Sequence, residues 1–184
     1  MALVFSITLA VFAYILFFAY DWVSVRRPLV AHTSLLFGGG VVLVVVSTLI
    51  LVLNSLELVS FSCSLIVGLV LTVVSFGAML WSLVFSLPKG TYSQPGERRR
   101  VYEGGAYALC RHPGVFFFCC LYIGLLIALP SFVNFLGFIF LCLGNVAYML
   151  FQDKWTFPLM LEGYEEYKNH SNLFIPRVSA RIRA

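Results

Sequence analysis

Charged side chains are scarce in this sequence. Lys and Arg number 12 and Asp and Glu number 8, so that 11% of the 184 residues carry a charge, against about 25% in an ordinary soluble domain. The apolar set AVILMFWYC makes up 61% of the chain. So few charges cannot cover so large an apolar core, which excludes a soluble globular domain, a disordered chain and a nucleic-acid-binding protein. The composition predicts an integral membrane protein.

Cysteines at the spacing of a metal site are absent as well. The sequence contains no C-x-x-C pair, and the neighbouring cysteines at 119 and 120 point in different directions on a helix. We therefore expect neither a disulfide framework nor a metal site, and we interpret the cysteines as small apolar residues. They are Cys63, Cys110, Cys119, Cys120 and Cys142.

Long stretches without charge set the number of expected helices. No Asp, Glu, Lys or Arg occurs in 1–20 or in 112–152, and Glu57 is the one charged residue in 28–88. Because a membrane helix needs about 20 residues, these stretches hold one, two and two crossings. The first has no basic segment or small-residue cleavage site, so we expect a retained helix and not a signal peptide. The expected helices cover 2–20, 33–53, 59–83, 113–130 and 131–151.

Five crossings place every Lys and Arg on one side of the membrane. By the positive-inside rule that side is the cytoplasm, which puts the N-terminus outside and the C-terminus in the cytoplasm. Four or six helices would break this sorting. The basic residues are Arg26 and Arg27 in the first connection, Lys89, Arg98, Arg99, Arg100 and Arg111 in the third, and Lys154, Lys168, Arg177, Arg181 and Arg183 in the tail.

The connection between the fourth and fifth helices is nearly absent, because Pro130-Ser131 joins two apolar runs directly. Proline disfavours continuation of the preceding helix, so we expect a tight hairpin. The expected fold class is an all-α integral membrane protein. Residues 1–88 form an N-terminal three-helix region, and residues 89–184 form a second half with a cytoplasmic loop, the hairpin and an amphipathic tail.

Two further patterns have a structural interpretation. Gly38-Gly39-Gly40 lies inside the second expected helix, where glycines favour close helix packing. Trp22, Trp81 and Trp155 fall near expected helix ends, as aromatic residues at a membrane interface do.

Polar residues gather where the chain enters the fourth helix and leaves the fifth. Arg111-His112-Pro113 opens a helix whose free N–H groups favour a carboxylate or phosphate, and Gly104-Gly105 lets the backbone approach a ligand. Asp153 follows the fifth helix. Because the hairpin returns the chain to the same depth, we expect His112 and Asp153 to be neighbours in a site at the cytoplasmic rim. The alternative is that Arg111 and His112 only anchor the helix at the headgroups.

This arrangement resembles a known family. Arg111-His112-Pro113, the hairpin, Tyr164-x-x-Tyr167 and Phe174-Ile175-Pro176, in this order, are similar to the isoprenylcysteine carboxyl methyltransferases and the related phospholipid N-methyltransferases. The resemblance covers residues 97–177. It implies S-adenosylmethionine as methyl donor, held at the cytoplasmic face, and a lipophilic acceptor from the bilayer.

The resemblance also implies roles for individual residues. Asp153 and Glu166 are candidate catalytic bases for an acceptor such as a phenol that needs one; the alternative is that each is a cofactor ligand or a solvated charge. Asn145 and Tyr148 stand where the substrate group is expected. Contacts with the methyl donor fall on Arg100, Val101, Tyr102, Tyr107, His112, Pro113, Gly114, Val115, Gln152 and Asp153.

The sequence departs from the family pattern at several positions. Val115 and Phe117 stand where RHP-x-Tyr-x-Gly has its Tyr and Gly, and Gln152 replaces the first Glu of an acidic pair. Residues 145–148 contain no Arg, so a carboxylate acceptor lacks its ion partner. Phospholipid amines, thiols, isoprenoid acids and quinol-like phenols all stay open as acceptors.

Two other classes of function are compatible with the sequence. Membrane sterol and enone reductases carry a similar RHP and use NADPH, whose 2′-phosphate suits Arg98-Arg99-Arg100, although those enzymes are larger. A non-catalytic membrane protein is favoured by the departures at Val115, Phe117 and Gln152. A transporter is disfavoured, since five helices form no even inverted repeat. The sequence leaves the oligomeric state open.

Overall fold

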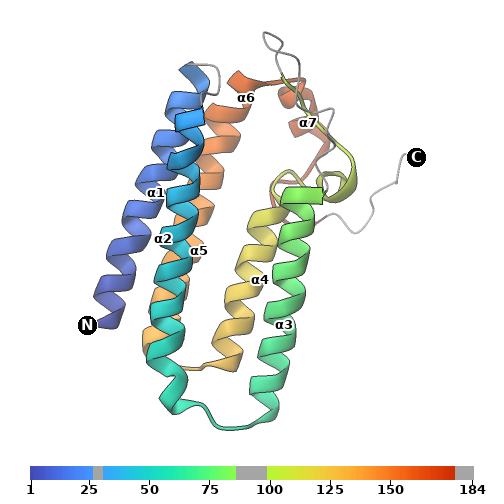
Figure 1. The fold of residues 1–184 in the computed structure, drawn as a ribbon. Helices are drawn as coiled ribbons and strands as arrows, with labels where there is room; N and C mark the ends of the chain where they lie inside the picture. Colours follow the sequence, from blue (N-terminus) through green and yellow to red (C-terminus); the bar gives the residue numbers. More distant parts are fainter. Residues whose placement is uncertain (27–30, 86–98, 177–184) are drawn as a thin grey trace.

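The structure, a computed structural model, describes residues 1–26, 31–85 and 99–176. It is an elongated bundle in which five long helices run side by side (Figure 1). The all-α prediction is confirmed, and each expected helix is present with shifted ends. The helices are α1 (Ala2–Arg26), α2 (Ala31–Ser55), α3 (Cys63–Leu80), α4 (Pro113–Ala128) and α5 (Phe132–Phe151).

The predicted end of the first helix at residue 20 was wrong, because α1 continues to Arg26. Asp21 does not terminate the helix: its side chain is buried and accepts a hydrogen bond from Thr156 Oγ1 at 3.1 Å. The predicted start of the third helix at residue 59 was also wrong. The short helix η1 (Leu56–Leu58) comes first, and Ser62 caps α3 by accepting the Leu65 N–H at 3.3 Å.

Aromatic side chains of α1 pack against glycines of the neighbouring helices. A Cβ at Gly40 of α2 would lie 2.5 Å from the Phe17 ring of α1, and one at Gly144 of α5 would lie 2.2 Å from the Tyr14 ring. The packing role predicted for the glycine run therefore holds at Gly40, whereas a Cβ at Gly38 would meet nothing within 4 Å. These contacts bind α1, α2 and α5 into one layer of the bundle.

Helix α3 packs mainly on α4, and the two backbones approach closely. A Cβ at Gly68 would lie 2.3 Å from the Ala128 nitrogen, and a Cβ at Gly124 would lie 2.7 Å from the Thr72 nitrogen. Small residues four apart on both helices are typical of membrane helix pairs, where dispersion contacts between backbones replace the hydrophobic effect.

The hairpin between α4 and α5 is confirmed. Ser131 accepts the Asn134 N–H at 3.0 Å and so caps α5, while Asn134 Nδ2 donates to the Leu129 carbonyl at 2.8 Å and closes the end of α4. Asn134 is fully buried. The turn thus satisfies its own backbone groups, and it returns α5 antiparallel to α4 (Figure 1).

The predicted end of the fifth helix at residue 151 is confirmed, because α5 ends at Phe151. The helical path then continues through a π-helical turn, η5 (Gln152–Thr156), and through α6 (Phe157–Met160). A two-residue strand, β2 (Leu161–Glu162), pairs in parallel with β1 (Arg99–Arg100), and α7 (Tyr164–His170) follows. α3 likewise ends in a π turn, η2 (Trp81–Phe85). Elements from both halves of the sequence therefore meet at one end of the bundle.

Four helical segments of the described chain are long and apolar enough to cross a membrane. They are Ala2–Arg26, Ser34–Ser55, Cys63–Val84 and Phe132–Met160. α4 is shorter, at 16 residues, or about 24 Å at 1.5 Å per residue. Large apolar side chains cover the outside of these helices; Val73 and Phe132, for example, are 68% and 74% exposed.

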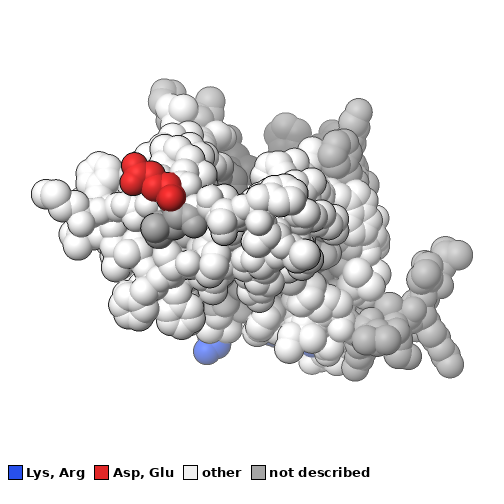
Figure 2. Space-filling model, turned by 90° about the horizontal axis from the view of Figure 1, so that it is seen from below, with Lys and Arg blue, Asp and Glu red and all other residues white. Residues whose placement is uncertain are grey.

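Charge is distributed unevenly between the two ends of the bundle. The end that carries the N-terminus and the α4–α5 hairpin is almost uncharged apart from one acidic patch, with basic atoms only at its margin (Figure 2). The described basic residues belong to elements at the opposite end: the end of α1, the start of α4 and the segments after α5 (Figure 1). The predicted boundary between residues 88 and 89 lies outside the described residues. So do six of the basic residues counted in the sequence: Arg27, Lys89, Arg98, Arg177, Arg181 and Arg183.

Candidate functional site

The Arg111-His112-Pro113 corner and the segment after α5 meet at one end of the bundle. His112 Nε2 lies 3.3 Å from Asp153 Oδ1. Both side chains are buried, at 6% exposure. The predicted proximity of His112 and Asp153 is confirmed, and its cause is the one expected: a tight hairpin brings α5 back beside the start of α4.

Asp153 is the centre of a polar cluster. Arg111 Nε donates to Asp153 Oδ1 at 2.9 Å, and Tyr164 OH donates to the same oxygen at 2.7 Å. A buried carboxylate is tolerated only when it is paired and hydrogen-bonded, and three donors meet that need here. No hydrogen bond from a described residue reaches the other oxygen, Oδ2, which leaves one acceptor atom of the cluster for a ligand.

Arg111 also holds the tail. Its Nη1 donates to the carbonyls of Lys168 and Ser171, at 3.1 and 2.7 Å, and so caps the C-terminal end of α7. The backbone N–H groups of Arg111 and His112 donate to the carbonyls of Asn172 and Leu173. This corner is therefore fastened to the tail through both backbone and side chain.

His112 is held in the neutral form by its surroundings. Burial lowers the pKa of the imidazole and the Arg111 guanidinium lowers it further, although the Asp153 carboxylate opposes both effects. The ring stacks on Phe157 of α6 with 5.5 Å between centroids. The Tyr164 pKa is raised by burial and by the Asp153 carboxylate that it donates to, so the phenol stays protonated and acts as a donor.

The N-terminal end of α4 offers fewer free donors than the sequence suggested. The His112 N–H is used by Leu173, Pro113 has no N–H, and the Val115 N–H bonds to the His112 carbonyl at 3.1 Å. In this first turn the N–H of Gly114 has no backbone acceptor among the described residues. A Cβ at Gly114 would lie 3.1 Å from Leu83 Cδ2, so this turn abuts η2.

The loop before α4 lies beside the cluster. Val101 donates its N–H to the Glu162 carbonyl at 3.0 Å, which extends the pairing of Arg100 with the segment after α6. The rings of Tyr102 and Tyr107 meet edge to face at 6.4 Å, and both residues are half-buried. A Cβ at Gly104 would lie 2.3 Å from the Tyr102 hydroxyl, and Gly105 has a positive φ of 56°, which favours glycine; the predicted approach of this backbone to a ligand stays a prediction.

Tyr167 of α7 fastens the same loop. Its hydroxyl donates to the carbonyls of Tyr107 and Cys110. Cys110 is fully buried, and burial raises the pKa of its thiol to about 11, which keeps the thiol protonated and unreactive.

Among the described residues, the side chains of the remaining predicted ones form no hydrogen bond with Asp153, whose partners are Arg111, His112 and Tyr164. Gln152 Nε2 donates to Tyr148 OH at 2.9 Å, and Tyr148 itself packs in the helix core, with its ring stacked on Phe17 at 5.3 Å. Asn145 is half-buried on α5, and Glu166 is exposed on α7. The roles proposed for these four residues stay predictions.

Two contributors to this end of the molecule were missed as site residues. Tyr164 was noted only as part of Tyr-x-x-Tyr, although that spacing on a helix places Tyr164 and Tyr167 on one face, where both are 3% exposed. Asp21 was not singled out. Its signal was an acid directly after an uncharged run of helical length.

The described residues fit a methyl donor in part. A half-buried aromatic pair, Tyr102 and Tyr107, suits a sulfonium cation, and Gly114 N–H and Asp153 Oδ2 offer one donor and one acceptor. Arg111, His112 and Asp153 Oδ1 are committed to each other and to the tail. These groups therefore hold the site in place and offer few further contacts to a ligand.

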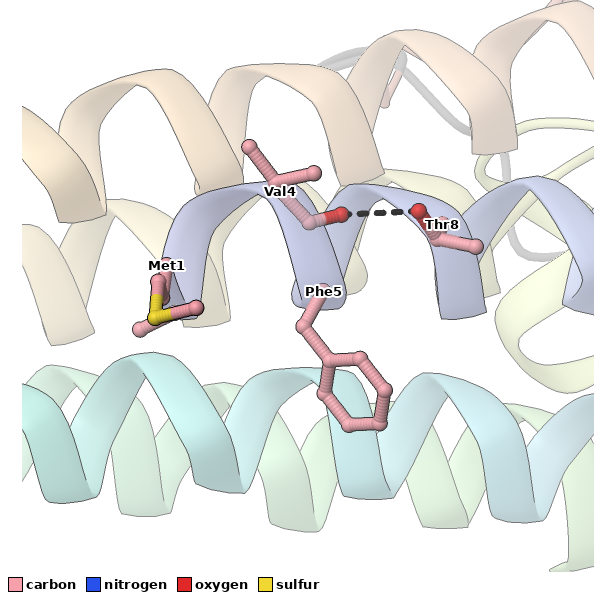
Figure 3. Close-up of a pocket in the computed structure, with 5 residues that line it drawn as sticks. Met1, Val4, Phe5 and Thr8 are labelled. Carbon is pink, nitrogen blue, oxygen red and sulfur yellow. Dashed lines mark hydrogen bonds between the residues drawn. The ribbon is translucent and has the colours of Figure 1, made fainter.

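A separate shallow groove lies at the start of α1, far from this cluster. Its lining is apolar except for Thr8, whose hydroxyl donates to the Val4 carbonyl at 2.9 Å (Figure 3). Phe5 and Met1 flank it. With no charged side chain in its lining and one hydroxyl that is already bonded, the groove is apolar apart from the amino group of Met1.

No protein-family model, curated protein or solved structure matches this chain.

Proposed function

We propose that the chain crosses a membrane five times, with the polar cluster around Asp153 at the cytoplasmic face. The proposal takes the short α4 as the fourth crossing, because it and α5 run antiparallel between the same two ends of the bundle. The charge asymmetry between the ends supports the orientation. The N-terminus then lies outside and the C-terminus in the cytoplasm.

At this face we propose S-adenosylmethionine-dependent methyl transfer to a lipophilic acceptor in the membrane. The observation that carries the proposal is the cluster itself: Arg111, His112 and Tyr164 converge on one oxygen of a buried carboxylate at the membrane edge. An ionisable cluster retained at such depth is expected to serve a function. The resemblance of residues 97–177 supplies the reaction class.

The chain's own residues would contribute positioning and not covalent chemistry. S-adenosylmethionine, when bound, would supply an electrophilic methyl group: the acceptor lone pair would form a bond to the methyl carbon as the methyl–sulfur bond breaks in line, leaving a neutral thioether and, from an acceptor atom that carries one, a proton. Tyr102 and Tyr107 would face the sulfonium, and Gly114 N–H and Asp153 Oδ2 would orient its polar groups. Orientation of this kind accounts for about 7–11 kcal/mol of a barrier.

The test uses the purified full chain in detergent. S-adenosylhomocysteine at about 100 times its Kd should stabilise the protein by about 2.7 kcal/mol, and labelled methyl groups from the donor should enter one fraction of a lipid extract. Asp153→Asn removes the carboxylate but keeps its shape, and it should abolish binding in the folded protein. Glu165→Gln is the matched control, because Glu165 is exposed and has no role in the proposed site, and it should bind normally.

A non-catalytic membrane protein is the second candidate. It is favoured by a specific observation, the full commitment of Arg111 and His112 to Asp153 and the tail. Thermal unfolding separates the candidates: stabilisation by NADPH and not by S-adenosylhomocysteine would indicate a reductase, and no response to either would favour the non-catalytic protein.

A further inference from the structure

The first helix places a second buried carboxylate at the same end of the bundle. Asp21 is 2% exposed, and Thr156 Oγ1 donates to its Oδ2 at 3.1 Å. The side chains of Gln152 and Tyr148 are further neighbours of this carboxylate. Within the described part of the chain no Lys, Arg or His forms an ion pair with Asp21. Its partners are therefore neutral donors.

These donors form one stripe along the fifth helical segment. Tyr148, Gln152 and Thr156 follow each other at a spacing of four, which places them on a common face directed at α1. Asp153 points away from that face, toward Arg111 and Tyr164. The π-helical turn η5 is thus held on two sides: the Asp21 carboxylate of α1 binds the turn, and the Asp153 carboxylate of the turn itself binds the neighbouring segments.

The amide at position 152 matches this arrangement. Gln152 Nε2 donates to Tyr148 OH at 2.9 Å, and the Gln152 side chain is a neighbour of Asp21. A glutamate at 152 would bring two carboxylates into contact in a buried site, which is strongly unfavourable. The absence of an acid at 152, noted as a departure in the sequence, is therefore compensated in space by an acid from α1.

We infer that Asp21 is a positioning residue, which through Gln152 and Thr156 fixes the η5 turn and so aims Asp153 at the Arg111–His112 corner. The site needs one carboxylate in total at positions 21 and 152, and that carboxylate can come from either helix. Two carboxylates at these positions, or none, destabilise the turn. The effect on methyl-donor binding rests on the proposed function; the effect on η5 does not.

The experiment exchanges the two groups. Asp21→Asn and Gln152→Glu are made singly and together in the full chain, and each protein is measured by thermal unfolding, by hydrogen exchange of the Gln152–Thr156 amides and by binding of S-adenosylhomocysteine. Each single variant should unfold at lower temperature, exchange faster in η5 and bind S-adenosylhomocysteine about tenfold or more weakly, because the loss of one hydrogen bond to a misdirected Asp153 weakens binding by about that factor. The double variant should recover most of each property.

Ser47→Ala is the matched control. It removes another buried hydrogen bond of α1, the 2.7 Å contact between the Ser6 and Ser47 hydroxyls, far from η5. It should lower the unfolding temperature but leave η5 exchange and ligand binding unchanged.

The outcomes separate the two proposals. Rescue of stability and of η5 protection by the double variant supports the positioning role, and it does so even if no variant, wild type included, binds S-adenosylhomocysteine, in which case only the proposed function fails. A double variant no better than the singles, or a Ser47→Ala protein that loses η5 protection equally, would overturn the inference.

Discussion

Removing one hydroxyl should measure how strongly the Asp153 cluster holds the tail. Tyr164→Phe deletes the donor that lies 2.7 Å from Asp153 Oδ1, and it keeps the ring, which contacts Phe157 edge to face at 5.4 Å. Tyr164 is 3% exposed, so water does not replace the lost donor. A hydrogen bond to a charged group contributes about 1.5–3 kcal/mol, and we expect a loss of that size in the free energy of unfolding.

Denaturant unfolding in detergent micelles measures this loss. Tyr102→Phe is the control, because Tyr102 is half-buried in the neighbouring loop and its ring contact with Tyr107 survives the change; a change within about 0.5 kcal/mol is expected there. Equal stability of the two variants would refute the claim that Asp153 depends on Tyr164.

Three further predictions concern pH, helix packing and the tail. Burial lowers the pKa of His112. On acidification the unfolded chain therefore takes up a proton near pH 6.5, before the folded chain does. The contribution of His112 to the free energy of unfolding is fully present above about pH 6.5 and is lost as the pH falls through the folded pKa. Unfolding measured from pH 8 to 5 should show this fall in the wild type and a weaker one in His112→Gln; a rise on acidification would contradict it. Gly68→Ala should destabilise by about 1–3 kcal/mol through overpacking, because its Cβ would meet the Ala128 nitrogen at 2.3 Å, whereas Gly77→Ala, with nothing within 4 Å, should not destabilise in the same unfolding assay. Arg111→Lys cannot serve Asp153 and the α7 carbonyls together, so hydrogen exchange of residues 164–170 should accelerate; unchanged protection would contradict the capping role.

The long apolar helices followed from the sequence because their signal is strong and local. Uncharged runs of helical length and a proline between two of them gave five helices and a hairpin, and the hairpin alone was enough to predict that His112 and Asp153 meet. That prediction needed no side-chain detail, since antiparallel helices of similar length return to the same depth.

The helix ends and the direction of the polar side chains did not follow. Asp21 reads as a helix end in isolation, and only Thr156, distant in sequence, makes it a buried partner. Gln152 and Asp153 are adjacent in sequence and were assigned to one site, but in the π-helical turn Gln152 donates back to Tyr148 of α5, whereas Asp153 contacts His112 at the start of α4. Such contacts depend on tertiary packing, which sequence periodicity does not encode.

The sidedness of the polar cluster is the central claim, and thiol labelling tests it directly. Cys63, at the start of α3, is exposed, whereas Cys110 is buried, so Cys63 is a natural reporter for the uncharged end. Glu103→Cys and Glu162→Cys, each in a Cys63→Ser background, report on the exposed positions beside β1 and β2. A membrane-impermeant maleimide applied from outside to intact cells should label Cys63 in the wild type and neither introduced cysteine until the membrane is opened. Labelling of Glu103→Cys and Glu162→Cys from opposite sides, or of either from the same side as Cys63, would contradict the account.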